Sequence, residues 1–301
     1  MSKAIYFECS SGISGDMTVA ALLDLGADEA KLNKVLESIP VKGFKTEITR
    51  VKKSGIDCCD FNVILDKEHE NHDHDMEYLY GHRHDHEHDH DHDHEHGHDH
   101  DHGHDHDYEH HYEHGHDHDH EHHHDHGNHH HEHRGMKEIR SIIEETSMSD
   151  GARALAVRMF EIIAKAEAKA HGVPEDEVHF HEVGAVDSIV DVISIAVCFD
   201  DLGMEAIIPE LSEGRGSVRC QHGVLPVPVP AVLNIAQENG LRLHIMNVEG
   251  EFVTPTGAAF AAAAGGNRTL PESFKVLKAG LGAGKRKHEL SGILRALLIE
   301  Y

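Results

Sequence analysis

Histidines alternate with acidic residues through a long tract in the first half of the chain. Residues 68–134 hold 30 of the 36 histidines, interleaved with 22 Asp or Glu residues. Neutral imidazole is a good ligand for Zn²⁺, Cu²⁺ and Ni²⁺, and neighbouring carboxylates can accept a hydrogen bond from its second nitrogen. We predict that the tract binds several metal ions in interchangeable sites; the alternative is a solubilising acidic linker. The tract includes His84, His86, His88, His90, His92 and His94.

Two further histidines lie on a predicted strand over Val178–Val183. Alternation along a strand places His179 and His181 on one face and directs Glu182 to the other. Two imidazoles at the end of a strand can bind a divalent metal ion. The alternative is that both are edge residues with ordinary hydrogen-bond partners.

The helix predicted after this strand, Ala185–Leu202, is largely apolar but carries two carboxylates. Asp187 and Asp191 are four residues apart, so they lie one above the other on the same helix face. For Asp187 the alternative is that it simply complements the helix dipole. Asp191 is harder to explain in this way, because a carboxylate among Ile and Val is rarely left without a partner. We predict that the two aspartates face His179 and His181 across a metal or substrate site.

A turn-rich loop joins the first predicted strand to the first predicted helix. Its serines and glycines precede a helix N-terminus, where backbone N–H groups bind anions. The loop is neither a P-loop nor a dinucleotide fingerprint, because both glycine patterns are absent. Asp16 can bind metal, and the alternative is that it lies in the first helical turn only to complement the helix dipole. For the two similar loops at Gly214–Gly216 and Thr254–Gly257, the alternative is a surface turn with a solvated Arg. We predict binding roles here for Ser10, Ser11, Gly12, Ser14, Gly15 and Asp16, and in two similar loops for Arg215, Thr254 and Thr256.

The composition of the chain limits its partners. The formal charge is −28, Trp is absent and there is no basic stripe, which argues against a nucleic-acid partner. No apolar run reaches the ~20 residues that a bilayer span needs, and the N-terminus lacks a signal-peptide layout. Five cysteines without Cys-x-x-Cys spacing fit a reduced compartment better than a disulfide framework. We therefore expect a cytoplasmic protein with no membrane contact.

Alternating helix and strand signals predict an α/β or α+β fold with a mixed sheet and packed helices. Residues 1–66 are predicted as a strand, two helices and a hairpin. Residues 67–134 hold almost nothing apolar to bury, so we expect a disordered His/Asp-rich insert that acts as a linker. Residues 135–301 are predicted as the main unit, in one globule with 1–66. Within it, Ser212–Ser217 is predicted as a flexible loop.

Four segments resemble, in order along the chain, the LarC-type nickel insertion proteins. The resemblance covers nearly all of the predicted ordered chain, and a His-rich insert between the first two segments is a frequent feature of that family. The segments are Tyr6–Met17, His179–Asp191, Gly214–Ala231 and Val253–Ala258.

The resemblance implies a nickel-inserting enzyme of the lyase class. Such proteins place Ni²⁺ into pyridinium-3,5-bisthiocarboxylic acid mononucleotide, and the nickel-pincer product, with S–Ni and C–Ni bonds, serves lactate racemase-like enzymes. The family reaction is linked to CTP with Mg²⁺ or Mn²⁺, which we assign to a C-terminal domain. Family members are commonly longer, so we expect an N-terminal portion with that domain as a partner, and a homo-oligomer. The alternative is a non-catalytic nickel storage protein or metallochaperone.

The implied reaction needs a base beside the metal, because forming a C–Ni bond displaces a ring proton. The loop over residues 10–15, with Asp16, would then anchor the substrate phosphate. The predicted catalytic residues are Asp187, Asp191 and Glu182, and the predicted nickel ligands are His179, His181, Asp187 and Asp191.

Overall fold

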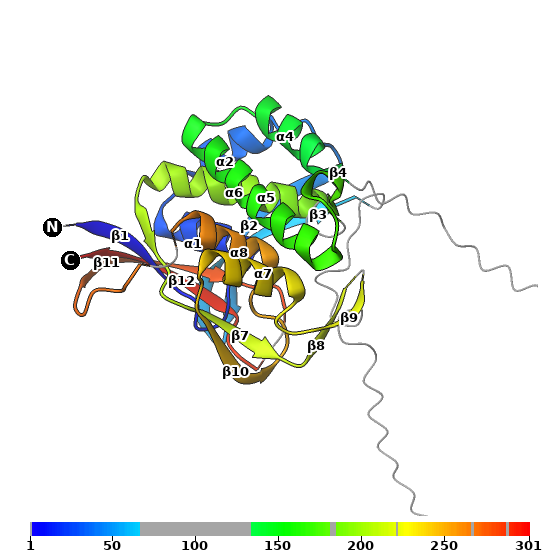
Figure 1. Ribbon diagram of the computed structural model, residues 1–301. Coiled ribbons are helices and arrows are strands. Elements are labelled where there is room, and N and C mark those ends of the chain that lie inside the picture. Colours follow the sequence, from blue (N-terminus) through cyan, green and yellow to red (C-terminus); the bar gives the residue numbers. More distant parts are fainter. Residues whose placement is uncertain (1, 67–133, 181–184, 221, 266–267, 287–288) are drawn as a thin grey trace, which may run out of the picture. The chain divides into compact units, whose positions relative to one another are not determined.

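The computed structural model describes the chain on either side of the histidine tract (Figure 1). Predictions about the tract itself, about His181 and about Glu182 lie outside the described residues. In the part of the chain that is described, no helix is long and apolar enough to cross a membrane. The described residues are 2–66, 134–180, 185–220, 222–265, 268–286 and 289–301.

A six-stranded mixed sheet is the largest β element. Strand β1 pairs in parallel with β6 on one side and antiparallel with β12 on the other. Strands β2 and β3 form the hairpin predicted from the sequence, with Ser54 and Gly55 both at positive φ in the turn. In sheet order the strands are β2 (Phe44–Lys53), β3 (Ile56–Leu65), β11 (Lys275–Ala283), β12 (Ile293–Glu300), β1 (Lys3–Glu8) and β6 (Glu205–Ile207).

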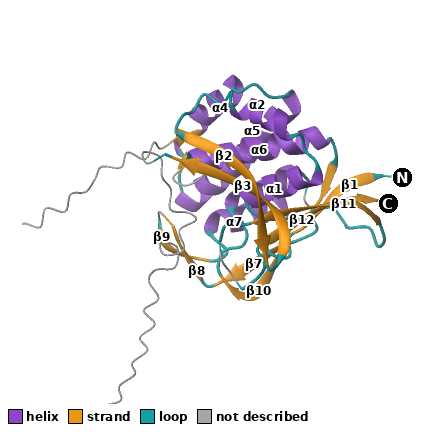
Figure 2. Cartoon of the chain, turned by 180° about the vertical axis from the view of Figure 1, so that it is seen from behind, coloured by secondary structure: helices purple, strands orange, loops and turns teal. Residues whose placement is uncertain are grey.

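Helices cover one face of this sheet, so the predicted mixed α/β architecture is confirmed. Figure 2 shows β2 and β3 in front of the helical layer. Helix α1 lies directly against β11, β3 and β12, and the apolar helix α6 is buried between α1, α5 and β3. The helices are α1 (Gly15–Leu25), α2 (Glu29–Leu36), α4 (Met136–Glu145), α5 (Asp150–His171), α6 (Val186–Leu202), α7 (Pro230–Asn239), α8 (Pro255–Ala263) and the 3₁₀ turn η1 (Glu175–Glu177).

Three small two-stranded sheets complete the described residues, and one corrects a prediction. The segment Ser212–Ser217, predicted as a flexible loop, lies mostly in strand β7, which pairs in parallel with β10. Residues 211–214 are buried there, so tertiary packing overrides the low strand propensity of Ser, Glu and Gly. The pairs are β7 (Leu211–Arg215) with β10 (Leu243–Glu249), β8 (Ser217–Cys220) with β9 (Gly223–Pro226), and β4 (Arg134–Gly135) with β5 (His179–Phe180).

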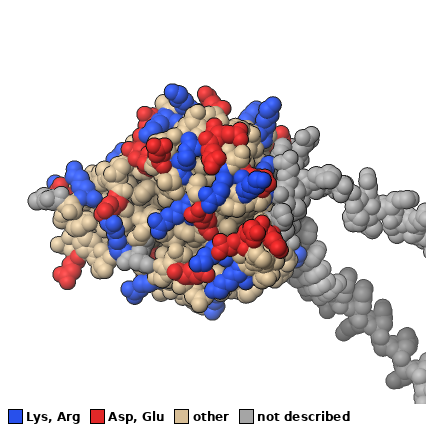
Figure 3. All heavy atoms as spheres, turned by 45° about the horizontal axis from the view of Figure 1, so that its top comes forward, with Lys and Arg blue, Asp and Glu red and all other residues tan. Residues whose placement is uncertain are grey.

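One hydrophobic core joins the residues before the histidine tract to those after it. In this core, the ring of Phe260 on α8 makes T-shaped contacts with two other rings, at 5.2 Å from Phe7 and 5.4 Å from Phe199 between centroids. On the surface, Figure 3 shows Lys and Arg side chains interspersed with Asp and Glu. This mixed surface fits the sequence count, in which most of the net negative charge belongs to the tract.

Candidate functional site

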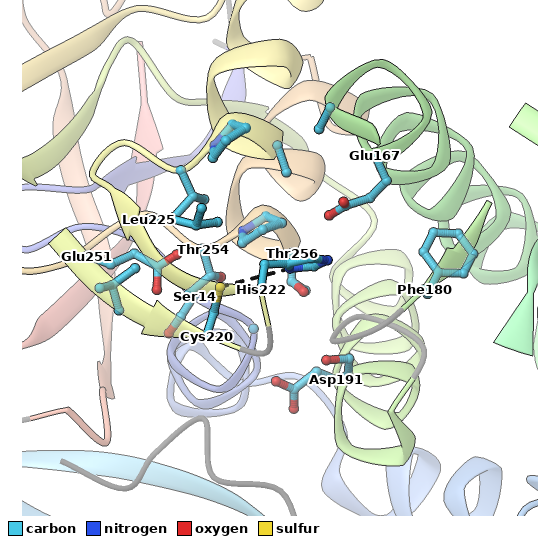
Figure 4. Close-up of a pocket in the computed structure, with 18 of the residues that line it drawn as sticks. Ser14, Glu167, Phe180, Asp191, Cys220, His222, Leu225, Glu251, Thr254 and Thr256 are labelled. Carbon is cyan, nitrogen blue, oxygen red and sulfur yellow. Dashed lines mark hydrogen bonds between the residues drawn. The ribbon is translucent and has the colours of Figure 1, made fainter. Parts of the chain in front are cut away.

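A cavity of about 240 Å³ opens where four helices of the described residues begin. It is lined by the N-terminal ends of α1, α6, α7 and α8, by the C-terminal end of α5, and by the β8–β9 hairpin. Figure 4 shows side chains from these elements around one space. A helix N-terminus carries a partial positive charge, so four of them together favour carboxylates or an anionic ligand.

Asp191 of α6 packs directly against the start of α1. A Cβ atom at Gly15 would lie 2.3 Å from its Oδ2, so only glycine allows this approach. The backbone N–H of Asp16 donates to the Asp191 carboxyl group. Burial, followed by the nearby charges of Asp16 and Asp187, nevertheless raises the Asp191 pKa well above its usual range. Asp191 therefore favours the protonated, neutral form.

Asp16 presents a buried oxygen that lacks a hydrogen-bond partner. The residue is only 6% exposed. Its Oδ1 accepts a hydrogen bond from the Ser14 hydroxyl, whereas its Oδ2 is buried without a partner. Leaving a carboxylate oxygen unsatisfied in the interior is costly, so this atom is suited to receive a proton or a cation. Asp16 lines both the main cavity and a neighbouring one of about 50 Å³.

Asp187 is the third carboxylate of the cavity. It lies in the first turn of α6, and its Oδ1 accepts a hydrogen bond from the Ser188 backbone N–H at 2.9 Å. The predicted stacking of Asp187 and Asp191 on one helix face is confirmed, since both line the cavity. Within the described residues, no three His, Cys, Asp or Glu side chains are spaced to hold a metal ion.

The other predicted residues divide between the cavity and the framework around it. Ser14, Thr254 and Thr256 line the cavity, and Thr254 caps α8 by accepting from the Gly257 N–H at 3.2 Å. Ser11 lines the smaller cavity, where its hydroxyl lies 3.3 Å from that of Ser291.

Three further predicted binding residues line neither of the two cavities. Ser10 is exposed and donates to Glu8, and Arg215 is exposed at the end of β7. Gly12 has a φ of +82° and sits against the Phe252 carbonyl, which is a packing role. His179 pairs with Gly135 in the β4–β5 ladder.

A second wall of the cavity carries groups that the sequence analysis did not single out. His171 Nε2 lies 3.5 Å from Glu167 Oε2, and the rings of His171 and His222 stand 4.8 Å apart. His222 Nδ1 is 3.9 Å from Cys220 Sγ, across the turn of the β8–β9 hairpin. Burial raises the Glu167 pKa to about 6, and burial together with His171 lowers the His222 pKa. In the sequence, the Cys-x-His spacing of Cys220 and His222 is the one local pattern that points to this wall.

Two buried acidic residues border the carboxylate side. Glu251 is paired with Arg286, and both line the main and the smaller cavity. Behind them, the Glu213 side chain is wholly buried, and its Oε1 accepts hydrogen bonds from three backbone N–H groups. These N–H groups belong to the crossing of β7 with the segment that leads into α8. Glu213 therefore holds the Thr254 region in place.

The described residues thus define an α/β protein whose cavity brings together carboxylates, imidazoles and a thiol. The family model described as "Nickel insertion protein" matches residues 5–301, so the chain belongs to the nickel insertion protein family. The resemblance found in the four sequence segments is confirmed.

Curated relatives carry the same family name. A protein of Alkaliphilus metalliredigens named pyridinium-3,5-bisthiocarboxylic acid mononucleotide nickel insertion protein is 46% identical over 301 residues, which cover 100% of this chain and 61% of the relative. A protein of the same name from Akkermansia muciniphila is 32% identical, with 99% and 60% covered. A putative nickel insertion protein of Geobacter sp. is 35% identical, with 99% and 62% covered. The chain thus spans about three fifths of these relatives. No solved structure matches it.

Proposed function

We propose that this chain inserts nickel into pyridinium-3,5-bisthiocarboxylic acid mononucleotide, the compound in the names of two relatives. The observation that carries this proposal is the buried, unpartnered Oδ2 of Asp16, next to Asp191, whose carboxyl group accepts from the Asp16 backbone N–H. Insertion forms two S–Ni bonds and one C–Ni bond, and the C–Ni bond replaces a ring C–H bond. The displaced proton needs an acceptor close to the metal.

The three carboxylates suit that proton transfer. Burial and the nearby charges of Asp16 and Asp187 raise the pKa of Asp191, so Asp191 is the carboxyl group whose surroundings favour the protonated form. We assign the unpartnered oxygen of Asp16 as the atom that accepts the ring proton or first contacts the nickel ion. Asp187 lies on the same side of the cavity and is proposed as a further ligand or base. The roles predicted for His179, His181 and Glu182 remain proposals.

The phosphate of the substrate is best placed near the start of α8. Thr254 and Thr256 lie at a helix N-terminus on the cavity wall, and Arg286 lies beside them in the lining. A helix N-terminus with hydroxyl groups and a guanidinium is a common arrangement for binding phosphate. We therefore shift the phosphate anchor from the predicted loop 10–15 toward this end of the cavity.

Further steps belong to the same proposal. We propose that the chain acts in the cytoplasm as a homo-oligomeric lyase, and that its product matures lactate racemase-like enzymes. CTP with Mg²⁺ or Mn²⁺ would be bound by the part of the longer relatives that this chain does not cover. A nickel storage or chaperone role is the second candidate, and the 30 histidines of the tract favour it.

Product analysis distinguishes the two candidates. The purified chain is incubated with Ni²⁺ and the dithio-mononucleotide, with and without CTP and Mg²⁺, and the small molecules are analysed by mass spectrometry. Insertion predicts a product that has gained nickel and lost a proton. Nickel retained on the protein without any nickel-containing product would instead indicate storage.

A further inference from the structure

The cavity wall opposite the carboxylates carries a thiol and an imidazole at contact distance. Cys220 is the last residue of β8, and His222 follows at the turn into β9, where Gly223 has a φ of +94°. The hairpin pairs Cys220 with Gly223. This tight turn directs Cys220 Sγ and His222 Nδ1 toward each other at 3.9 Å (Figure 4).

Cys220 differs from the other four cysteines of the chain, all of which lie within the described residues. Those four are buried, and burial raises the pKa of each thiol, so they are chemically quiet members of the core. Cys220 is partly exposed and lines the cavity. It is therefore the cysteine that a metal ion in the cavity can reach.

His171 and Glu167 extend this group along the same wall. The His171 ring lies beside His222 at 4.8 Å, and its Nε2 is held 3.5 Å from Glu167 Oε2 one helical turn away. A carboxylate that holds one nitrogen of an imidazole orients the ring and makes it a better ligand. The wall thus joins a thiol and two imidazoles, which prefer softer divalent ions than carboxylates do, with a carboxylate that orients one of the imidazoles.

We propose that Cys220 and His222 form a capture site that receives Ni²⁺ before insertion, with His171 and Glu167 as supporting groups. This inference rests on the proposed nickel insertion. Two protein ligands leave the other coordination positions of the ion open, which suits cargo that must pass to two substrate sulfurs. Binding releases the thiol proton to solvent.

The test uses the full chain and nickel sulfate alone, added beyond the capacity of the histidine tract. Only a cysteine thiolate gives the near-ultraviolet thiolate-to-nickel absorption band, so the tract does not interfere. We expect the band in the wild type and in His244→Gln, an exposed histidine outside the cavity. We expect it to be absent in Cys220→Ser and to require about tenfold more nickel in His222→Gln.

A second measurement needs no variant. Iodoacetamide should label Cys220 in the native chain, as located by mass spectrometry, and nickel should slow this labelling. A missing band in the wild type, a band that persists in Cys220→Ser, or labelling unaffected by nickel would overturn the inference. Product formation without the band would refute the capture site and leave the proposed function standing. The absorption band without any product would support the capture site and count against the proposed nickel insertion.

Discussion

Glu213→Gln tests the electrostatic description of the buried framework behind the cavity. The Glu213 side chain is completely buried in β7. Its Oε1 accepts from the N–H groups of Gly214 at 2.8 Å, Phe252 at 2.7 Å and Val253 at 3.2 Å, while its Oε2 has no partner. Glutamine keeps the accepting oxygen and replaces the unpartnered oxygen with an uncharged amide. The change therefore removes a charge with little change in shape.

The magnitude follows from the shift in acidity. Burial is the main cause that raises the Glu213 pKa to about 7, against about 4.3 for an unperturbed Glu. Above pH 4.3 the unfolded chain loses this proton while the folded chain keeps it, so the free energy of unfolding falls as pH rises. The loss ends near pH 7, and the full shift is worth about 4 kcal/mol at ~1.4 kcal/mol for each pKa unit. About 3 kcal/mol of it falls between pH 4 and pH 8, because the titrations are not complete at these limits. The Glu213→Gln variant has no titrating carboxyl group at this position, so its free energy of unfolding does not show this fall.

The assay is urea unfolding of wild type and variant from pH 4 to pH 8, with a chelator to keep metal off the tract. Taking the difference between the two chains cancels the contribution of every other titrating group. We predict that the variant gains about 3 kcal/mol relative to wild type between pH 4 and pH 8. Two parallel stability curves across this range would refute the reasoning.

Two further predictions concern the site and the tract. Gly15→Ala should slow nickel insertion strongly, because the new Cβ would displace the Asp191 side chain. The double variant Gly15→Ala with Asp191→Gly should still fold, because the side chain that the Cβ would meet is gone. Equal insertion rates in wild type and Gly15→Ala would contradict the contact between Gly15 and Asp191. Deletion of residues 68–134 should remove most bound nickel in equilibrium dialysis, and the intact chain should release it as pH falls through about 6.5, where imidazole takes up a proton. Unchanged stoichiometry after the deletion would reject the tract as a metal store.

Local signals explain why most helices could be predicted. Gly26, Gly172, Gly203 and Gly240 each follow a helix in the left-handed conformation, and Pro230 opens α7; glycine and proline at such positions are local signals that a sequence displays directly. Strand β7 was not predicted, because its Ser, Glu and Gly residues enter a strand only through pairing with the distant β10. The β8–β9 hairpin, which pairs locally, was not predicted either.

The candidate site shows the same division between local and distant information. Asp187 and Asp191 were placed together because a helix puts residues four apart on one face. The contact of Asp191 with Gly15 links positions on opposite sides of the histidine tract, and no local pattern contains it. The wall formed by Glu167, His171 and the β8–β9 hairpin likewise depends on how α5 and the hairpin pack around the cavity.

The most direct test of the proposed site is nickel insertion by Asp16→Asn. Asparagine keeps the shape of the side chain but removes the carboxylate whose Oδ2 lacks a partner. Asp176→Asn, at an exposed aspartate in η1 outside the cavity, is the matched control. With nickel and dithio-mononucleotide in excess and CTP present, we predict wild-type product formation for the control and at least ~100-fold slower formation for Asp16→Asn, the usual range for loss of a general base. Equal product formation by both variants would contradict the account.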